Sequence, residues 1–381
     1  MGDIRILENA QDEQFLTCSQ EITDLSKEGY QLLKENRVNE ALECFKQILE
    51  LDTDNNYALV GMGDSCRKRG AHRDAVRYYE QCLNHHPGNN YALFGLADCY
   101  KVLNQYPMAI KIWKEYLKHD SRNVTVLTRI ADAYRKLRDF KNSKEEYERV
   151  LQMEDHNPYA IIGLGHLHYD FKEYRDALYF WEKMLETRNM ACVDIRVLTS
   201  IGNCHRKLKT FDDGIAYFDA ALQREPNNFY ALFGLGDCFR GLNQPRRALE
   251  YWNRILQQDP RNKVILTRAG DAYCTLREFD NAKDYYNRAL NIEFDIYGAL
   301  GLATIDKLQG HIEQAINSLT KLLQHDPKNH RLYLELADCY IKIDDAHQAV
   351  EILRAFQRFG IRNNAVTDLL EKIGESRIAA L

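Results

Sequence analysis

Few residues of this sequence combine the types and the spacing that catalysis requires. Gly-x-Gly triplets at 61–63, 163–165 and 234–236 resemble half of the fingerprint that places a dinucleotide phosphate at a helix N-terminus. That fingerprint follows a β-strand, whereas these triplets lie in stretches whose apolar residues recur every three or four positions, as in a helix. We therefore interpret the triplets as positions where helices pack closely.

Nucleophile and metal motifs are also incomplete. Gly63, Asp64 and Ser65 are not followed by the second glycine of the turn that presents a nucleophilic serine. His166 and His168 are two positions apart on an expected helix, so they point to different faces and cannot chelate one ion. We find no catalytic residue, predict neither a metal site nor a cofactor, and expect that the chain is not an enzyme.

Composition narrows the kinds of partner. The 381 residues include 51 Lys and Arg against 56 Asp and Glu, and the net charge of -5 argues against nucleic acids and anionic membranes as partners. No apolar run is long enough to span a membrane, and the acidic N-terminus does not resemble a secretory signal. None of the ten cysteines forms a Cys-x-x-Cys pair. We expect a cytoplasmic protein with reduced, buried thiols that binds a protein or a peptide.

A 34-residue repeat organises almost the whole chain. The stretch NNYALVGMGDSC at 55–66 returns as NNYALFGLADCY at 89–100, and related stretches follow at 157–168 and 229–239. The same spacing divides residues 22–363 into ten repeats. Their first residues are 22, 56, 90, 124, 158, 195, 229, 263, 296 and 330.

At three places of the repeat the size of the side chain is constant. The eighth and twentieth places hold only Gly, Ala or Ser, and four places after the twentieth comes a large residue. Two amphipathic helices approach closely where both present small side chains, and the large residue then fills the space beside the crossing. The large residues are Phe45, Tyr79, Trp113, Tyr147, Trp181, Phe218, Trp252, Tyr286, Leu319 and Leu353.

This small–small–aromatic pattern resembles the tetratricopeptide repeat family over about nine-tenths of the chain. The resemblance implies an all-α fold, a right-handed superhelical solenoid of about ten helix-turn-helix repeats in residues 22–363. It also implies that the first helix of each repeat lines a concave groove, where members of the family hold a peptide or a partner's helix. Residues 364–381 fit a C-terminal capping helix, because a solenoid must cover its last apolar face.

Residues 1–21 differ from the repeats in charge. They contain five acidic residues against Arg5 alone, a net of -4. Apolar residues such as Ile4 and Phe15 suit a capping segment, the charge suits a mobile acidic arm, and both interpretations stay open. A mobile arm would be able to occupy the groove of a second copy and cause weak self-association.

The expected concave face carries two charged columns. The ninth place is mostly Asp, including Asp98, Asp132 and Asp237, and three places later come bases such as Arg135 and Arg240. An acid and a base three apart on a helix pair with each other. One interpretation is a self-neutralising ladder that fixes neighbouring repeats in register. The other is a polar rail that hydrogen-bonds the backbone of a partner.

A column of tyrosines at the second place gives the most specific hypothesis. A glycine follows each of them by four residues, so each ring faces bare backbone on the same helix surface. Either the glycines allow close packing between repeats, or they open five aromatic pockets to a ligand. Two repeats carry Arg129 and Arg268 instead of glycine, and we expect these charges to set the ligand's polarity. The tyrosines are Tyr57, Tyr91, Tyr159, Tyr230 and Tyr297, and the glycines are Gly61, Gly95, Gly163, Gly234 and Gly301.

Two functions therefore remain open. The first is a non-enzymatic interaction module that binds a peptide or partner helix in the groove. The second is a scaffold or assembly factor that binds folded partners, or itself, through its outer surface and termini. We do not expect the carboxylate clamp of chaperone adaptors, because Val60, Phe94 and Phe233 occupy places where the clamp needs polar residues, and Asp stands where it needs Asn.

Overall fold

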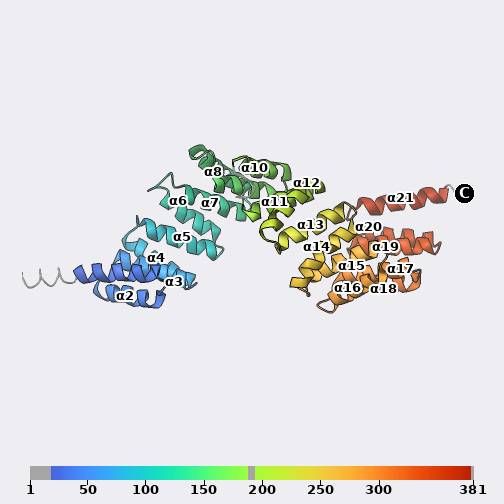
Figure 1. Cartoon of the computed structure of the whole chain (residues 1–381), viewed down its shortest axis with the longest axis horizontal. Helices are drawn as coiled ribbons and strands as arrows, with labels where there is room; N and C mark the ends of the chain where they lie inside the picture. The colour runs from blue at the N-terminus through green and yellow to red at the C-terminus, as the bar shows by residue number, and fades with distance from the viewer. Residues whose placement is uncertain (1–18, 188–193, 379–381) are drawn as a thin grey trace, which may run out of the picture. The chain divides into compact units, whose positions relative to one another are not determined.

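The computed structural model describes residues 19–187 and 194–378, and every regular element in these ranges is helical. Consecutive helices pack side by side as hairpins joined by short turns (Figure 1). The chain divides into two compact units, Met1–Arg188 and Asn189–Leu381. Within each unit the hairpins follow one another as in a solenoid, so the expected all-α fold of helix-turn-helix repeats is confirmed.

The first unit begins with a helix over residues 19–34. The later helices of this unit are, in turn, the second and the first helix of successive repeats. They are α2 (Val38–Leu51), α3 (Asn56–Lys68), α4 (His72–His85), α5 (Asn90–Val102), α6 (Tyr106–Tyr116), α7 (Val124–Lys136), α8 (Phe140–Met153), α9 (Pro158–Asp170) and α10 (Tyr174–Thr187).

The second unit continues the alternation from a first helix and ends in one additional helix. Its helices are α11 (Ile195–Leu208), α12 (Phe211–Arg224), α13 (Phe229–Gly241), α14 (Pro245–Gln258), α15 (Lys263–Thr275), α16 (Phe279–Leu290), α17 (Ile296–Leu308), α18 (Ile312–His325), α19 (His330–Lys342), α20 (Ala346–Gln357) and α21 (Asn364–Ile378).

Capping residues and turn residues set the ends of the helices. Asn55 and Asn89 precede α3 and α5, and their side chains accept hydrogen bonds from the backbone N–H groups of Ala58 and Ala92 at 3.1 and 3.0 Å. The turn inside each hairpin needs one residue with a left-handed backbone. That residue is the fifteenth of each repeat, namely Asn36, Gly70, Asn104, Arg138, Lys172, Lys209, Asn243, Arg277, Gly310 and Asp344.

The large residue of each repeat is the centre of the packing. The ring of Tyr79, on α4, is closed between Gly63 of its own repeat and Gly95 of the next. A Cβ atom on Gly63 would lie 2.5 Å from Cε1 of Tyr79, and one on Gly95 would lie 2.4 Å from Cζ. Only glycine leaves room for the ring at these two places. The rings that share this arrangement are Phe45, Phe218 and Tyr286.

This packing gives a structural reason for the glycines that follow the tyrosine column. A Cβ atom on Gly163 would lie 2.3 Å from Cε1 of Tyr147, and one on Gly301 would lie 2.3 Å from Cζ of Tyr286. Each glycine therefore faces a core ring of the preceding repeat. The glycines therefore serve close contact between repeats, and Gly95 and Gly301 also line open cavities beside Tyr91 and Tyr297.

Four cysteines share the tenth place of their repeats and are fully buried: Cys99, Cys204, Cys238 and Cys339. Burial raises the pKa of Cys99 and Cys339 to about 11 and that of Cys238 to about 12. These three thiols therefore stay protonated at neutral pH and pack as small apolar groups.

Helix α21 covers the last hairpin of the second unit. Val366 and Ile373 are buried in one cluster with Leu353 and Phe356 of α20. This is the contact that a capping helix makes, since it removes the final apolar face of the repeats from water.

Candidate functional site

Five tyrosines stand in the first turn of first helices with their side chains in solvent. Tyr91 is the most exposed, at 81%, and Tyr297 the least, at 50%. The core aromatic rings, in contrast, are under 2% exposed. In the first unit these tyrosines are Tyr57 on α3, Tyr91 on α5 and Tyr159 on α9, and in the second they are Tyr230 on α13 and Tyr297 on α17.

Open cavities lie on the first-helix face of each unit, by which we mean the surface formed by the first helices of its repeats. In the first unit, a cavity of about 760 Å³ extends from the helix of residues 19–34 to Tyr57 and Tyr91. Beside it, a cavity of about 450 Å³ is lined by Tyr91, Phe94 and Tyr116. In the second unit, a cavity of about 760 Å³ lies among α13, α15, α17 and α19 and includes Tyr297.

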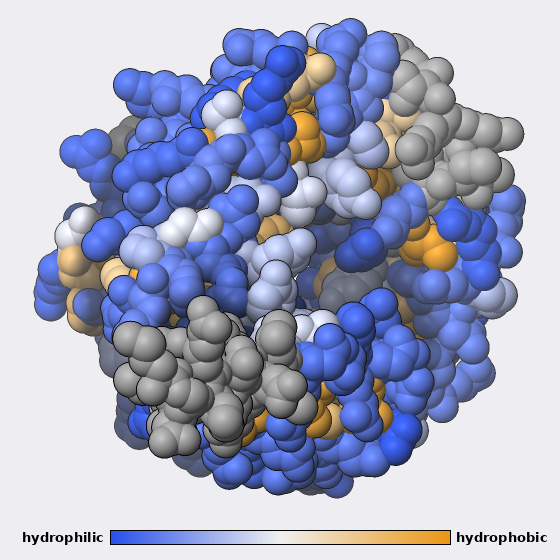
Figure 2. Space-filling view, turned by 90° about the vertical axis from the view of Figure 1, so that its left-hand side faces the viewer, coloured by the Kyte–Doolittle hydropathy of each residue, from blue (hydrophilic) through white to orange (hydrophobic). Residues whose placement is uncertain are grey.

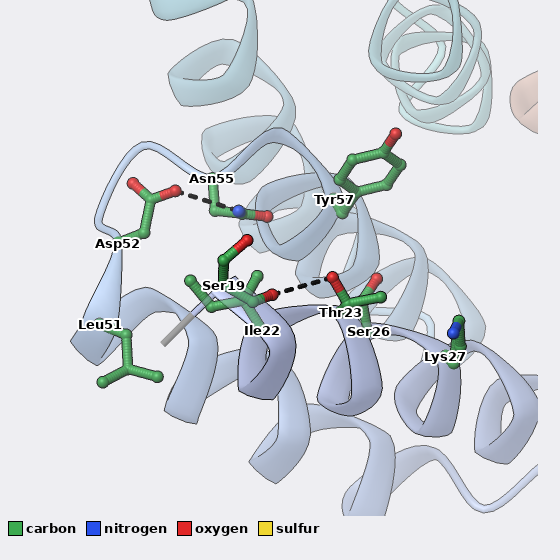
Figure 3. A pocket seen from close by; sticks show the side chains of 9 residues that line it. All are labelled: Ser19, Ile22, Thr23, Ser26, Lys27, Leu51, Asp52, Asn55 and Tyr57. Atoms are coloured by element: carbon green, nitrogen blue, oxygen red, sulfur yellow. Dashed lines mark hydrogen bonds between the residues drawn. The ribbon is translucent and has the colours of Figure 1, made fainter. Parts of the chain in front are cut away.

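A further cavity of about 670 Å³ lies between the helix of residues 19–34 and the turn before α3 (Figure 3). Asn55 donates to Asp52 across its edge at 3.0 Å, and the Thr23 hydroxyl donates to the Ser19 carbonyl at 2.9 Å. Tyr57 lies at the side of this cavity and also lines its larger neighbour. Tyr57 and Tyr91 thus border a series of adjoining hollows.

The ninth-place acids have two kinds of partner. Where the core ring of the repeat is a tyrosine, its hydroxyl donates to the acid. Burial, reinforced by the nearby carboxylate, raises the pKa of these hydroxyls, so they remain donors. The three bonds, of 2.6 to 2.7 Å, join Tyr79 to Asp64, Tyr147 to Asp132 and Tyr286 to Asp271.

In the third and seventh repeats the core ring is a tryptophan. The ninth-place acid of each of these repeats forms ion pairs with arginines of both neighbouring repeats. Asp98 of α5 pairs with Arg67 of α3 at 3.5 Å and with Arg129 of α7. The Arg129 guanidinium also lies 4.5 Å from the centre of the Phe94 ring. One carboxylate therefore ties three consecutive repeats together.

Asp237 of α13 holds the equivalent place in the second unit. Its side chain is only 1% exposed. It pairs with Arg206 of α11 at 2.7 Å, with Arg240 of its own helix at 3.4 Å, and with Arg268 of α15. Arg268 lies 4.7 Å from the centre of the Phe233 ring, as Arg129 does over Phe94.

Arg135 of α7 makes a similar connection to the following repeat. It bonds Asp170 of α9 at 2.7 Å and pairs with Asp132 of its own helix at 3.4 Å. Its side chain is 16% exposed. The charge is therefore committed to the contact between repeats.

Most of the predicted site charges thus lie in the packing rather than free in the groove. Arg129 and Arg268, which we expect to set a ligand's polarity, are each paired with a carboxylate one repeat away. Burial also lowers the pKa of both guanidinium groups. Arg240 differs, since its side chain remains 55% exposed. The geometry favours the ladder interpretation for the paired residues.

Pairing between each acid and the base three residues later was predicted from the sequence, whereas the partners in adjacent repeats were not. Those partners are separated by 31 residues, which is the repeat length less one helical turn. That spacing between acids and bases is the signal that would have found them.

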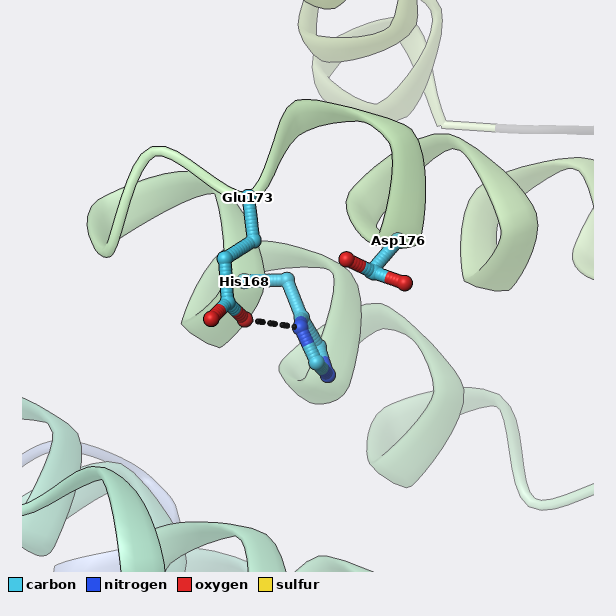
Figure 4. A group of neighbouring side chains, drawn as sticks. All are labelled: His168, Glu173 and Asp176. Carbon is cyan, nitrogen blue, oxygen red and sulfur yellow. Dashed lines mark hydrogen bonds and ion pairs between the residues drawn. The ribbon is translucent and has the colours of Figure 1, made fainter.

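One group among the described residues has the composition of a metal site. Ligand atoms of His168, Glu173 and Asp176 all lie within 4.8 Å of one another (Figure 4). His168 Nδ1 is hydrogen-bonded to Glu173 at 2.7 Å, and the ring stacks on Phe180. Both carboxylates are exposed, and one imidazole is a weak basis for a zinc site, which prefers several nitrogen or sulfur ligands. We interpret the group as a contact between α9 and α10.

Hydrophilic residues cover most of the face shown in Figure 2, and apolar residues appear there as small separate areas. Among the described residues, no helix has both the length and the apolar character of a membrane span.

Sequence models of the tetratricopeptide repeat match three parts of the chain. One matches residues 67–124 and 308–358, a second matches 202–260 and 239–298, and a third matches 124–157. The chain belongs to the tetratricopeptide repeat family. Tetratricopeptide repeats generally mediate protein–protein interaction, and the family is typically not catalytic.

Several solved structures are similar to this tetratricopeptide repeat chain. The MamA protein is 22% identical, with a TM-score of 0.40 over 45% of this chain and 92% of its own. A tetratricopeptide repeat protein of Parabacteroides merdae is 14% identical, with a TM-score of 0.43 over 72% and 94%. Pseudomonas aeruginosa pilF is 15% identical, with a TM-score of 0.46 over 56% and 96%. No curated protein matches the sequence.

Proposed function

We propose that this chain is a non-enzymatic interaction module that binds a peptide or a partner's helix on the first-helix faces of its units. The five exposed tyrosines are its anchors. The observation that supports this is their exposure of 50–81%, at one place of the repeat, in a protein whose other repeated aromatic column is fully buried.

Tyrosine suits this function for a physical reason. Its ring offers a large contact area with only two rotatable bonds, and its hydroxyl bonds the backbone of a bound segment. Tyr57 and Tyr91 line adjoining cavities, and Tyr297 lines the cavity of the second unit, so a bound side chain has space beside the ring.

The paired charges support the anchors indirectly. Asp98 and Asp237 hold neighbouring first helices at a fixed spacing through arginines of adjacent repeats. A partner then meets a preformed series of rings rather than one that must be ordered on binding.

The test uses peptides of 12 residues selected from a random library on the immobilised full chain. The Kd of a selected peptide is measured for the wild type and for Tyr91→Ala combined with Tyr230→Ala. Truncation of the anchor in the unit that holds the peptide is expected to cost about 1–3 kcal/mol of binding, without a change in melting temperature. Tyr179→Ala is the matched control, because Tyr179 is 62% exposed but lies on a second helix, α10.

Three results would contradict the proposal. Unfolding of the double variant would place the tyrosines in the core. Unchanged binding by the double variant would show that the partner binds at another surface, which would favour the scaffold function. Equal weakening by Tyr179→Ala would show that exposure alone, rather than the first-helix face, determines binding.

A further inference from the structure

The clusters around Asp98 and Asp237 are internal equivalents that differ in charge. In both, an acid of one first helix pairs with an arginine of the preceding repeat and an arginine of the following repeat. In both, an arginine lies over a phenylalanine ring, and an exposed tyrosine stands one turn before that ring. The two units therefore carry the same local framework.

The difference starts at the ninth place of the preceding repeat. In the first unit this is Asp64, which pairs with Arg67 at 3.0 Å and accepts from the Tyr79 hydroxyl at 2.7 Å. In the second unit it is Asn203, which accepts from Arg206 at 3.1 Å. The core ring of that repeat is Phe218, which has no hydroxyl to offer an acid. The second cluster has thus lost one carboxylate together with its tyrosine partner.

A second difference lies on the helix of the central acid. Lys101 of α5 is exposed, and among the described residues it has no ion-pair partner. At the equivalent place of α13, Arg240 lies 3.4 Å from Asp237. The ion-paired groups in the first cluster are therefore two acids, Asp64 and Asp98, with two arginines. In the second cluster three arginines share Asp237 alone.

The excess positive charge borders the cavity of about 760 Å³ in the second unit. Arg240 and Arg268 line it from α13 and α15, and Arg331 lines it from α19. The Arg331 guanidinium lies 5.9 Å from the centre of the Tyr297 ring, and the described residues provide no ion-pair partner for it. Two exposed guanidinium groups, Arg240 and Arg331, thus face a cavity beside an anchor tyrosine.

The acids of this cavity already have partners. Glu335 pairs with Lys307 at 2.5 Å. Asp295 caps α17 by accepting from the Gly298 N–H at 3.1 Å and also accepts from the Thr267 hydroxyl. Asp271 accepts from Tyr286 and, without a direct ion pair, is also attracted electrostatically by Arg240, Arg268 and Arg331. These bonds leave the exposed arginines as the groups with donors to spare.

We propose that the cavity among α13, α15, α17 and α19 binds an Asp or Glu side chain of an acidic partner segment through Arg240 and Arg331. Planar guanidinium groups donate paired hydrogen bonds to a carboxylate, which are among the stronger hydrogen bonds in proteins. The proposal rests on the proposed function, and it adds that the second unit, rather than the first, selects for acidic residues.

The test measures fluorescence anisotropy of a labelled peptide of six Glu-Ala repeats with the full chain, against the same peptide with Gln in place of Glu. The Glu peptide is expected to bind the wild type, and the Gln peptide to bind at least about tenfold more weakly. Arg240→Gln combined with Arg331→Gln should remove the preference. Lys101→Gln is the matched control in the first unit and should leave it unchanged.

Asn203→Asp is the second variant, because it restores the acid that the first unit has at this place. It adds a carboxylate next to Arg206 and is expected to weaken binding of the Glu peptide by about tenfold without removing any cation. Retention of the wild-type helical signal and melting temperature in circular dichroism shows that a loss of binding is not a loss of fold.

The proposal is overturned if the Glu and Gln peptides bind equally, if both kinds of variant keep the preference, or if Lys101→Gln removes it. The variants of this experiment keep every anchor tyrosine, and the variants of the tyrosine experiment keep Arg240 and Arg331. Failure of the tyrosine experiment and failure of this one are therefore separate results.

Discussion

The chain contains two regular columns of aromatic residues with opposite environments. The column four places after the twentieth is buried, with Tyr79, Trp113 and Trp252 at 0% exposure. The column at the second place is open to water, with Tyr91 at 81%. Both columns repeat with the same period, so periodicity alone does not distinguish a core residue from a surface anchor. The small residues that enclose a ring distinguish them: glycines of two repeats leave space for Phe45, Tyr79, Phe218 and Tyr286, and a glycine of the same repeat leaves space for Trp181 and Trp252.

The largest expected effect comes from removing a buried ring. Trp252→Ala should lower the free energy of unfolding by about 3–5 kcal/mol, because it leaves a cavity inside the hairpin of α13 and α14. Urea unfolding followed by circular dichroism measures the change. Tyr230→Ala in the same unit is the surface control, and an equal loss in both variants would remove the distinction between the columns.

The next effect comes from adding a methyl group beside a ring. A Cβ atom on Gly234 would lie 2.2 Å from Cζ of Phe218, so Gly234→Ala should destabilise the protein by about 1–3 kcal/mol. Gly298→Ala is the control on another first helix, since the nearest atom there is 3.5 Å away.

That control should change stability in the opposite direction. Alanine favours a helix over glycine by up to about 1 kcal/mol where there is space for the methyl group. If thermal denaturation shows both alanine variants to be stabilised, the glycines at the sixth place are not needed for the ring.

A smaller loss of stability is expected from removing the Tyr79 hydroxyl, which bonds a core ring to an acid of a first helix. Tyr79→Phe removes the 2.7 Å bond to Asp64 and should cost about 1 kcal/mol of unfolding free energy. Tyr91→Phe, which alters an exposed hydroxyl, should cost nothing measurable. Guanidinium titrations of the two variants provide the comparison, and equal midpoints would show that the buried bond does not stabilise the fold.

The smallest expected change in stability is that of a surface ring. Tyr91→Ala should stay within about 0.5 kcal/mol of the wild type, because the side chain leaves no cavity when it is removed. Differential scanning calorimetry of this variant is a sensitive check. A loss above 1 kcal/mol would mean that the ring is part of the packing between repeats.

Much of the fold followed from the sequence because helix pairing is a local property. The 34-residue spacing and the small residues at the eighth and twentieth places predicted the hairpins, and the structure and the family comparison confirm them. Tyr57 and Tyr91 are exposed, in agreement with the prediction that they lie on a surface of the first helices. Their role in binding stays a prediction.

The partners of the charged residues did not follow from the sequence, because they lie in neighbouring repeats. Arg129 is near Asp98 only after two hairpins have stacked, so the sequence of its own helix does not indicate this partner. Close packing between repeats was one interpretation of Gly95, but the ring that it accommodates, Tyr79, could not be identified because it belongs to the preceding repeat.

The sharing of rings between repeats has a consequence for how the protein unfolds. Phe45, Tyr79, Phe218 and Tyr286 are each half enclosed by the repeat that follows. A repeat that lost its successor would expose the ring, so neighbouring repeats should unfold together rather than one by one. A shortened chain would keep its last ring covered only if the cut came after the first helix of the next repeat. The boundaries of cooperative folding are therefore offset by one helix from the boundaries of the sequence repeat.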